Sequence, residues 1–176
     1  MIPEPMPDAS DYYQLMAVLR NLDPRVESLA TMLLFNPAAD LIQTLLECES
    51  PIEQLMYCGL LSRQKDLRSR LPFTVAPQQW LRDKDGQNRY RVDFMVEHAA
   101  TGVKIAIECD GFEYHEAPEA ATRDKARDRF IQAAGIPVLR FTGSEIWAQP
   151  YTCAREVANA LAELAAKQSS EKGAAS

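Results

Sequence analysis

Apolar residues recur at intervals of three and four along the first third of the chain, as at Leu41 and Leu45. This interval is the period of one buried face of an α-helix. Residues 1–9 are instead rich in proline and polar side chains, which is typical of a loose arm. The pattern therefore predicts two or three short helices after that arm, within Tyr12 to Leu22, Pro24 to Phe35 and Ala38 to Glu47.

A further helix is predicted to begin directly after Ser50. Ser50 can cap the helix, Pro51 suits the first helical position, and Glu53 follows the cap by three residues, which is the spacing of a capping box. The apolar stripe that this helix would bury consists of Leu55, Met56, Leu60 and Leu61.

From Pro72 onward, short extended runs bounded by turn residues replace the helical period. The segment Asp83 to Asn88 has Asp85 and Gly86 at its centre, a pair typical of the tight turn of a β-hairpin. Gly135 is a typical helix stop before another run of branched residues. The pattern predicts strands over Phe73 to Gln79, Tyr90 to Val96, Val103 to Cys109 and Ile136 to Phe141, with helices over Ala120 to Ala134 and Tyr151 to Ala166.

The predicted order is helix, three strands, helix, strand and helix. Because the fourth strand follows a crossover helix, it can lie parallel to a neighbour in the same sheet. This order indicates an α/β fold with a central four-stranded mixed sheet flanked by helices. We expect residues 1–47 to form an N-terminal arm and helical element, residues 48–167 the main domain, and residues 168–176 a disordered tail.

The length and composition are those of an ordinary soluble protein with a single core. The chain has 176 residues, of which 47% are hydrophobic and 25% are charged. No apolar run approaches the roughly 20 residues that cross a bilayer, and the first residues lack the basic and apolar regions of a signal peptide. The four cysteines form no CxxC pair, so neither a zinc site nor a disulfide framework is indicated. We therefore expect a cytoplasmic protein with no membrane partner.

The charges are unevenly distributed along the chain. The formal net charge is −6, which argues against binding of nucleic acid by overall positive charge alone. Residues 60–91 nevertheless carry eight basic and three acidic side chains. Such a run is either a phosphate-facing surface or a solvated face. Trp80 and Trp147 lie in no basic aromatic motif, and we expect both to pack in the fold rather than to stack on bases.

Three acidic residues interrupt two of the predicted strands. Asp93 alternates with Val92 and Phe94 and so points to the other face of its strand, while Glu108 and Asp110 share one face of the next strand. Two adjacent antiparallel strands can then bring Asp93 and Glu108 side by side. Such a cluster repels itself unless hydrogen bonds or a cation compensate, and hard cations such as magnesium or manganese bind carboxylate oxygens. The alternative is an acidic face in solvent.

Five groups of motifs stand in order along the chain with characteristic intervals. They are Ser50-Pro51-Ile52-Glu53, Tyr90-Arg91-Val92-Asp93-Phe94, Ile107-Glu108-Cys109-Asp110-Gly111 with Tyr114-His115, Arg123-Asp124-Lys125 with Arg127-Asp128, and Gly135-Ile136-Pro137-Val138-Leu139-Arg140-Phe141. Together they resemble a family of small endonuclease-like domains related to the very-short-patch mismatch repair endonuclease. That family lies within the PD-(D/E)XK, or restriction-endonuclease-like, superfamily. The resemblance covers about residues 48–150.

The resemblance implies a metal-dependent endonuclease site. By it, Asp93 is the acid that holds magnesium or manganese and Glu108 is a second ligand on the next strand. Glu53 is the helical acid that orients a metal-bound water, and His115 matches an active-site histidine.

The chain departs from the superfamily pattern at one position. Asp110 stands where the E-x-K signature has a lysine, and as a third carboxylate it is a further candidate metal ligand. A lysine there would position the attacking water or stabilise the charge on the phosphate. His115, Lys125 and Arg127 are the candidates to replace it.

The residues and the resemblance together predict a metal-dependent phosphodiesterase that acts on DNA. Because the signature lysine is missing, the alternative is a nuclease fold that has lost cleavage and serves as a nucleic-acid or protein-binding module. A further alternative is that residues 1–47 form a partner-binding element, through which a homodimer can assemble. The candidate contacts with nucleic acid are Arg68, Arg70, Arg89, Arg91, Lys125 and Arg127.

Overall fold

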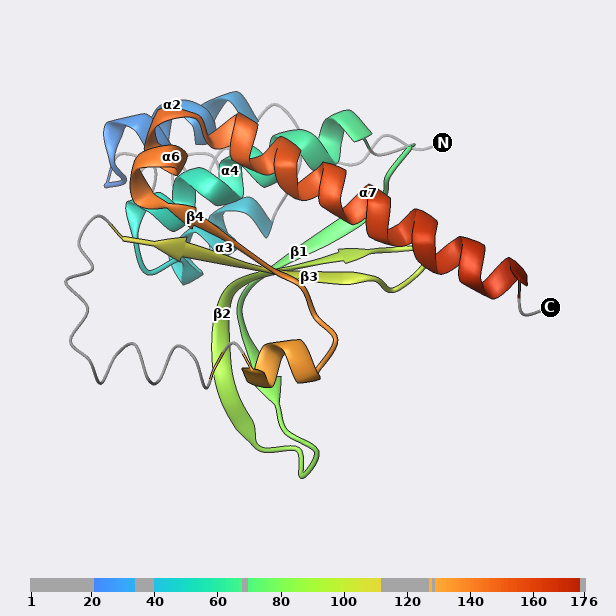
Figure 1. Cartoon of the computed structure of the whole chain (residues 1–176). Coiled ribbons are helices and arrows are strands. Elements are labelled where there is room, and N and C mark those ends of the chain that lie inside the picture. The colour runs from blue at the N-terminus through green and yellow to red at the C-terminus, as the bar shows by residue number, and fades with distance from the viewer. Residues whose placement is uncertain (1–20, 34–39, 68–69, 112–126, 128, 175–176) are drawn as a thin grey trace, which may run out of the picture.

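The computed structural model describes residues 21–33, 40–67, 70–111, 127 and 129–174 (Figure 1). The helix predicted over Tyr12 to Leu22 lies almost entirely outside these residues. Most of the helix predicted over Ala120 to Ala134 also lies outside them, although residues 129–133 are helical.

A four-stranded sheet forms the centre of the fold, with the strands in the order β1-β2-β3-β4. β1 pairs antiparallel with β2, β2 pairs antiparallel with β3, and β3 pairs parallel with β4. The mixed sheet predicted from the sequence is therefore confirmed. The strands are β1 (Phe73–Arg82), β2 (Asn88–His98), β3 (Lys104–Asp110) and β4 (Val138–Thr142).

Helices lie on both sides of the sheet. On one side α4 packs beside α7 and also contacts α2 and α6, while the helical residues 129–133 lie on the other side (Figure 1). Within the described part of the chain, no helix is long and apolar enough to cross a membrane. The helices are α2 (Pro24–Leu33), α3 (Asp40–Glu47), α4 (Pro51–Leu67), α6 (Gly143–Ala148) and α7 (Pro150–Ala174).

The larger hydrophobic core lies between the sheet and the helices α4 and α7. Phe94 and Ile107 of the sheet are fully buried there, together with Leu55 of α4 and Leu161 of α7. The ring of Tyr57 stacks on that of Phe94 with 6.1 Å between the ring centroids. This core fixes the orientation of α4 over β2.

Residues of α2 and α3 belong to the same core. Val26, Ala30 and Leu45 are fully buried in contact with it. The N-terminal helices that the structure describes are thus packed onto the main domain. Assembly of a homodimer through residues 1–47 stays a prediction.

A second, smaller core lies on the opposite side of the sheet. It is formed by Leu81, Val92, Ala106 and Ile131. The ring of Tyr90 packs against that of Phe130 beside it, with 5.2 Å between the ring centroids. The helical residues 129–133 are held against the sheet by these contacts.

Gly59 allows α4 and α7 to approach each other closely. A Cβ atom at this position would lie 2.6 Å from the carbonyl oxygen of Pro150, the first residue of α7. Pairs of non-bonded carbon and oxygen atoms do not approach this closely without strain. The two helices therefore require glycine at their crossing.

Helix α7 is longer than the sequence indicates. It continues to Ala174, so the prediction of a disordered tail is wrong for residues 168–174, which are helical. The Ser169 and Ser170 hydroxyls donate hydrogen bonds to the carbonyls of Ala165 and Ala166, one helical turn earlier. Bonds of this kind accommodate serine within a helix.

Helix α6 is absent from the sequence prediction. Thr142 Oγ1 accepts a hydrogen bond from the Glu145 amide at 3.3 Å, and the Glu145 carboxylate accepts one from the Thr142 amide at 2.8 Å. These two bonds make a complete capping box. The spacing is visible in the sequence, but the helix spans only 6 residues, too few for an apolar period to develop.

Candidate functional site

Strands β2 and β3 separate from each other in the middle of the sheet. They are paired from Glu97 and Lys104 as far as Phe94 and Ile107. Beyond that point β2 continues with β1 alone, and β3 continues beside β4 (Figure 1). We call this point the fork. The part of the β1-β2 hairpin beyond it, residues 79–92, is called the hairpin arm.

The burial of apolar residues explains why the strands separate. Phe94 is buried in the larger core, whereas Val92, two residues earlier, is buried in the smaller core on the other side. Residues two apart in a regular strand share a face. β2 therefore turns about its axis at Asp93, and this turn carries the hairpin arm away from β3.

Asp93 is the first residue of β2 beyond the last paired position. Its carboxylate oxygen Oδ2 accepts a hydrogen bond from the backbone amide of Cys109 at 2.6 Å. The side chain thereby satisfies an amide of β3 at the fork. Burial raises the pKa of Asp93, the Cys109 amide opposes this rise, and the charge of Glu53 adds to it.

Glu108 is the residue of β3 at the fork and is only 4% exposed. Its Oε2 pairs with the guanidinium of Arg127, whereas its Oε1 is buried and makes no hydrogen bond with the residues that the structure describes. Burial raises the pKa of Glu108 to about 7, even though the positive charge of Arg127 acts in the opposite direction. The charge of Asp93 raises the pKa of Glu108 further, so the two carboxylates are close enough to repel each other.

Arg140 also acts on Glu108. The two residues are directly paired across β3 and β4, so their side chains leave the sheet on the same face. The charge of Arg140 lowers the pKa of Glu108. Sequence reasoning missed this residue, although an arginine between the apolar Leu139 and Phe141 of a short strand was a visible signal.

Asp110 lies at the end of β3, half-buried, and its charge contributes to the raised pKa of Asp93. The structure therefore brings Asp93, Glu108 and Asp110 to the same region of the sheet. Within the described ranges, however, no group of three or more histidine, cysteine, aspartate or glutamate side chains has the arrangement of a metal site. His115 lies outside the described residues.

Glu53 lies on α4 and is 7% exposed. Its backbone amide donates to the Ser50 hydroxyl at 3.2 Å, as the capping-box spacing predicts. Its carboxylate accepts hydrogen bonds from that hydroxyl at 2.8 Å and from the Glu49 amide at 2.9 Å. A third donor, Nε2 of Gln78, reaches Oε2 at 2.7 Å. Both oxygens of Glu53 are thus held by the protein.

Gln78 is a site residue that the sequence analysis missed. It has a backbone φ of +49°, in the left-handed region that residues other than glycine seldom adopt. Pro77 and Gln79 pair with Phe94 and Val92, so Gln78 and Asp93 are the two residues left unpaired between these pairs. Strained backbone of this kind is often retained at functional sites. No pattern of residue types around a glutamine predicts such a conformation.

The predicted nucleic-acid contacts are partly engaged in ion pairs. Arg91 pairs with Glu49 at 2.6 Å, Arg89 pairs with Asp83 at 2.8 Å, and Arg127 pairs with Glu108. Arg70 is exposed. Arg68 and Lys125 lie outside the described residues.

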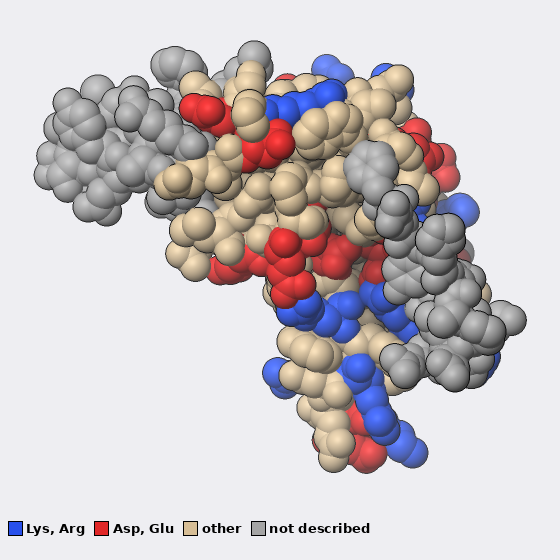
Figure 2. Space-filling view, turned by 90° about the vertical axis from the view of Figure 1, so that its left-hand side faces the viewer, with Lys and Arg blue, Asp and Glu red and all other residues tan. Residues whose placement is uncertain are grey.

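Acidic and basic side chains are segregated on the face that contains the fork. Figure 2 shows acidic side chains gathered across the middle of this face and basic side chains directly below them. The arm carries Arg82, Lys84, Arg89 and Arg91, against the acidic Asp83 and Asp85 of its turn. A basic surface therefore adjoins the carboxylates.

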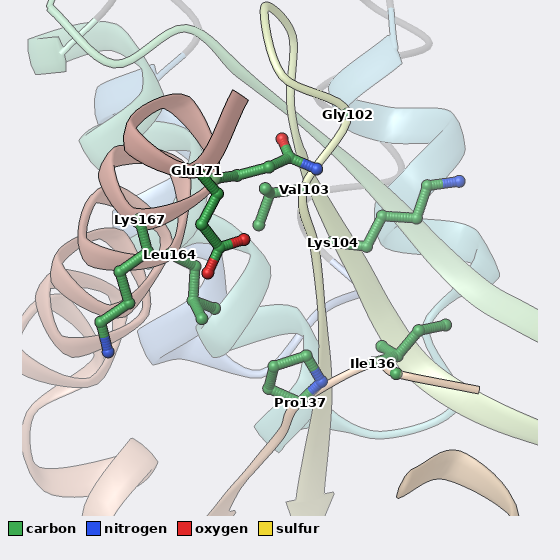
Figure 3. A pocket seen from close by; sticks show the side chains of 10 residues that line it. Gly102, Val103, Lys104, Ile136, Pro137, Leu164, Lys167 and Glu171 are labelled. Atoms are coloured by element: carbon green, nitrogen blue, oxygen red, sulfur yellow. The ribbon is translucent and has the colours of Figure 1, made fainter. Parts of the chain in front are cut away.

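A separate hollow of about 420 Å³ lies at the other end of β3 (Figure 3). Val103, Lys104, Pro137 and Leu164 are among the residues that line it. Lys104 and Asp110 are the two ends of β3, and the rise along the strand between them is roughly 20 Å. The hollow is thus distinct from the fork.

The arrangement at the fork suits a hard cation. A buried carboxylate oxygen without a hydrogen-bond donor, as at Glu108 Oε1, is an acceptor that a cation would satisfy. Aspartate and glutamate oxygens are the ligands that magnesium and manganese prefer. The donors at the fork are therefore of the chemical kind that a divalent metal binds, although the described residues form no group arranged as a metal site.

Comparison with known proteins places the chain in a family. Residues 64–161, more than half of the chain, match the model of REase_MTES_1575, a restriction-endonuclease-like family. The match includes Asp93, Glu108, Arg127 and Arg140. No curated protein and no solved structure matches the chain. With its mixed sheet and its carboxylates at the fork, the chain belongs to the restriction-endonuclease-like family REase_MTES_1575.

Proposed function

We propose that this domain is a divalent-metal-dependent phosphodiesterase that cleaves DNA. The observation that supports the proposal most strongly is the geometry of the fork. There, the half-buried Asp93 and the buried Glu108 meet in a restriction-endonuclease-like chain, and one oxygen of Glu108 has no donor among the described residues. The closer relation to the very-short-patch repair endonuclease stays a prediction.

Asp93 and Glu108 would hold a magnesium or manganese ion, and Asp110 is the candidate third ligand. Bound there, the ion would polarise the scissile phosphate and lower the pKa of a coordinated water. The Cys109 amide fixes the Asp93 carboxylate in place, which orients the ligand before any ion arrives.

Glu53 acts in this proposal as a positioning residue. Both of its oxygens accept hydrogen bonds from the protein, so it holds the side chain of Gln78 instead of facing an ion directly. Gln78 in turn lies between Pro77 and Gln79, which pair with the two neighbours of Asp93 on β2. This differs from the role that the resemblance implies for Glu53, in which it orients a metal-bound water.

Arg127 is the described residue best placed to supply the missing positive charge. Its guanidinium pairs with Glu108, and its Nη2 donates to the carbonyl oxygen of Arg91 at 3.1 Å. Arginine stays protonated at all working pH values and can bind two phosphate oxygens at once. Arg127 would therefore stabilise the charge on the phosphate. His115 and Lys125 remain predicted alternatives for this role.

A second candidate function is DNA binding without cleavage. Asp110 favours it, because a carboxylate in the place of the signature lysine adds a negative charge at the fork. The two functions differ in one measurable respect. Only the enzyme converts DNA into a nicked or linear product when a divalent metal is supplied.

The test is incubation of purified protein with supercoiled plasmid in magnesium, in manganese and in chelator. We expect nicked and linear products with either metal and none in chelator. Asp93→Asn and Glu108→Gln should abolish the products. Glu97→Gln is the matched control, since Glu97 lies on the same strand as Asp93 but pairs with Lys104 on the surface at 3.3 Å. Equal activity of all four proteins, or full activity in chelator, would contradict the proposal.

A melting experiment tests the metal site without requiring turnover. Asp93→Asn keeps the shape of the side chain and can still accept from the Cys109 amide, but it removes the charge. We expect magnesium to raise the melting temperature of the wild type more than that of this variant, because an ion that binds only the native state stabilises it. An identical response to magnesium would indicate that Asp93 does not bind the metal.

A further inference from the structure

Trp80 is an exposed aromatic side chain on the hairpin arm. It is 50% exposed, and this contradicts the expectation that it packs in the fold. The other tryptophan, Trp147, packs against the larger core, and the Arg25 guanidinium carbon lies 5.3 Å from its ring centroid. An exposed indole leaves a large apolar surface in water, which is unfavourable unless a partner covers it.

The pairing of the arm shows where Trp80 points. Trp80 is paired with Arg91, and the next pair, Leu81 with Tyr90, lies on the opposite face. Leu81 is buried in the smaller core and Tyr90 packs on Phe130, so that opposite face is the covered one. Trp80 and Arg91 therefore form the open face of the arm.

The open face leads directly to the carboxylates. Arg91 precedes Asp93 by two residues on β2, a distance along the strand of roughly 7 Å, so the open face begins close to the fork. Arg91 also pairs with Glu49, which neighbours the cap of α4. If one monomer of a polymeric ligand lies on Trp80, the next monomer is thus within reach of the fork.

The charge of the arm identifies the class of ligand. The basic residues of the arm outnumber the acidic ones, and one of them, Arg91, is paired with Trp80 across the hairpin. Phosphates are attracted by such basic side chains, and unpaired bases stack on exposed aromatic rings whatever their sequence. A base inside a perfect duplex cannot stack on Trp80 because its faces are already covered by its neighbours.

We propose that the open face of the hairpin arm binds a single-stranded or locally unpaired segment of DNA, with one base stacked on Trp80 and its phosphates against the arginines. This inference rests on the proposed function and specifies its substrate as DNA that contains unpaired nucleotides. The stacked base holds the strand with its backbone directed toward the fork.

The two tryptophans allow a direct test. Trp147→Phe leaves Trp80 as the single tryptophan, and Trp80→Phe leaves Trp147 as the single tryptophan. Each variant is titrated in chelator with a single-stranded oligodeoxynucleotide, with a perfect duplex, and with a duplex that contains an unpaired loop. We expect saturable quenching of Trp80 by the single strand and the looped duplex, weak quenching by the perfect duplex, and no change at Trp147.

Affinity measurements on full-length protein complete the test. Loss of one base stack weakens binding by about 5- to 150-fold, so Trp80→Ala should show a loss of this size for the single strand. Trp80→Phe retains a ring and should recover most of the affinity. Because Trp80 is exposed, Trp80→Ala should keep the melting temperature of the wild type. This measurement checks that the variant is folded. Wild-type affinity in folded Trp80→Ala, or equal quenching by the perfect duplex, would overturn the proposal.

The same experiment separates this inference from the proposed function. Binding is measured without metal, and Glu97→Gln, whose side chain pairs with Lys104 on the surface, should bind the single strand as the wild type does. If DNA quenches Trp80 but no plasmid is cut, the stacking of a base on Trp80 is supported and the proposed cleavage activity is contradicted. If Trp80 is instead quenched on raising the protein concentration without DNA, a second copy of the chain covers it and the inference is wrong.

Discussion

The guanidinium of Arg127 pairs with one oxygen of the Glu108 carboxylate, while the other oxygen is buried and lacks a hydrogen bond within the described part of the chain. A buried charge is costly unless all of its acceptor positions are satisfied. Among the described residues, a direct partner therefore satisfies only one of the two oxygens of Glu108. Glu108 should therefore influence both the stability of the metal-free protein and its affinity for a cation.

The stability of the metal-free protein should depend on pH through Glu108. Burial raises the pKa of this residue from 4.5 to about 7. Because the pKa is raised in the folded state, protonation of Glu108 stabilises the fold. This stabilisation is full below pH 4.5 and is lost as the pH rises toward 7. In chelator, Glu108→Gln should remove this loss, which is on the order of 1–3 kcal/mol above neutral pH. Chemical unfolding from pH 5 to 8 measures it, and parallel curves for both proteins would contradict the assignment.

Removal of Arg127 should leave Glu108 without its partner. We expect Arg127→Ala to lower the free energy of unfolding at pH 8 by on the order of 1–3 kcal/mol, because a buried carboxylate then stays unpaired. The loss should be smaller at pH 5, where Glu108 is protonated. In the double variant with Glu108→Gln, most of the stability should return. Lys104→Ala, which breaks an exposed ion pair with Glu97, is the control and should change little at either pH.

Gln78 should matter more to activity than to stability. Gln78→Gly relieves a strained φ of +49° but removes the hydrogen bond to Glu53. Strain costs about 1 kcal/mol or more and a hydrogen bond to a charged group contributes about 1.5–3 kcal/mol, so the net loss should be on the order of 1 kcal/mol. Plasmid nicking should fall at least about tenfold if Glu53 positions Asp93 through Gln78. Gln79→Ala, at the neighbouring exposed position, should leave the nicking rate unchanged.

Gly59→Ala should destabilise the larger core. The added methyl group meets the Pro150 carbonyl at 2.6 Å, and backbone atoms of α7 cannot move away without disturbing the helix. Overpacking of this kind costs about 1–3 kcal/mol. The melting temperature should fall by about 2–4 °C for each kcal/mol lost. Gly111→Ala is the control, because a Cβ atom there meets no atom of the described residues within 4 Å.

Strand alternation alone predicts much of the site. Asp93 and Glu108 lie on consecutive antiparallel strands, so a period of two residues and one hairpin connection are enough to bring them together. The capping-box spacing likewise places Glu53 in the first turn of α4. These relationships are local along the chain, which is why sequence patterns contain them.

The missed residues depend on relationships that are not local. Arg140 meets Glu108 through parallel pairing with a strand that follows a long connection. Gln78 reaches the site through an unusual backbone angle, which glutamine does not encode. Trp80 is exposed because β2 turns at Asp93 and carries the arm away from β3, so its surroundings follow from the bend and not from its neighbours in sequence.

The separation of β2 from β3 also leaves an open strand edge. Beyond the fork, no strand of the described residues lies beside the backbone groups of β2 that would face β3, and such edges can recruit strands from other molecules. The Arg127 guanidinium donates to the Arg91 carbonyl on that edge at 3.1 Å. A bulky cation placed there obstructs edge-to-edge association. We therefore expect loss of Arg127 to favour aggregation even in a protein whose fold is intact.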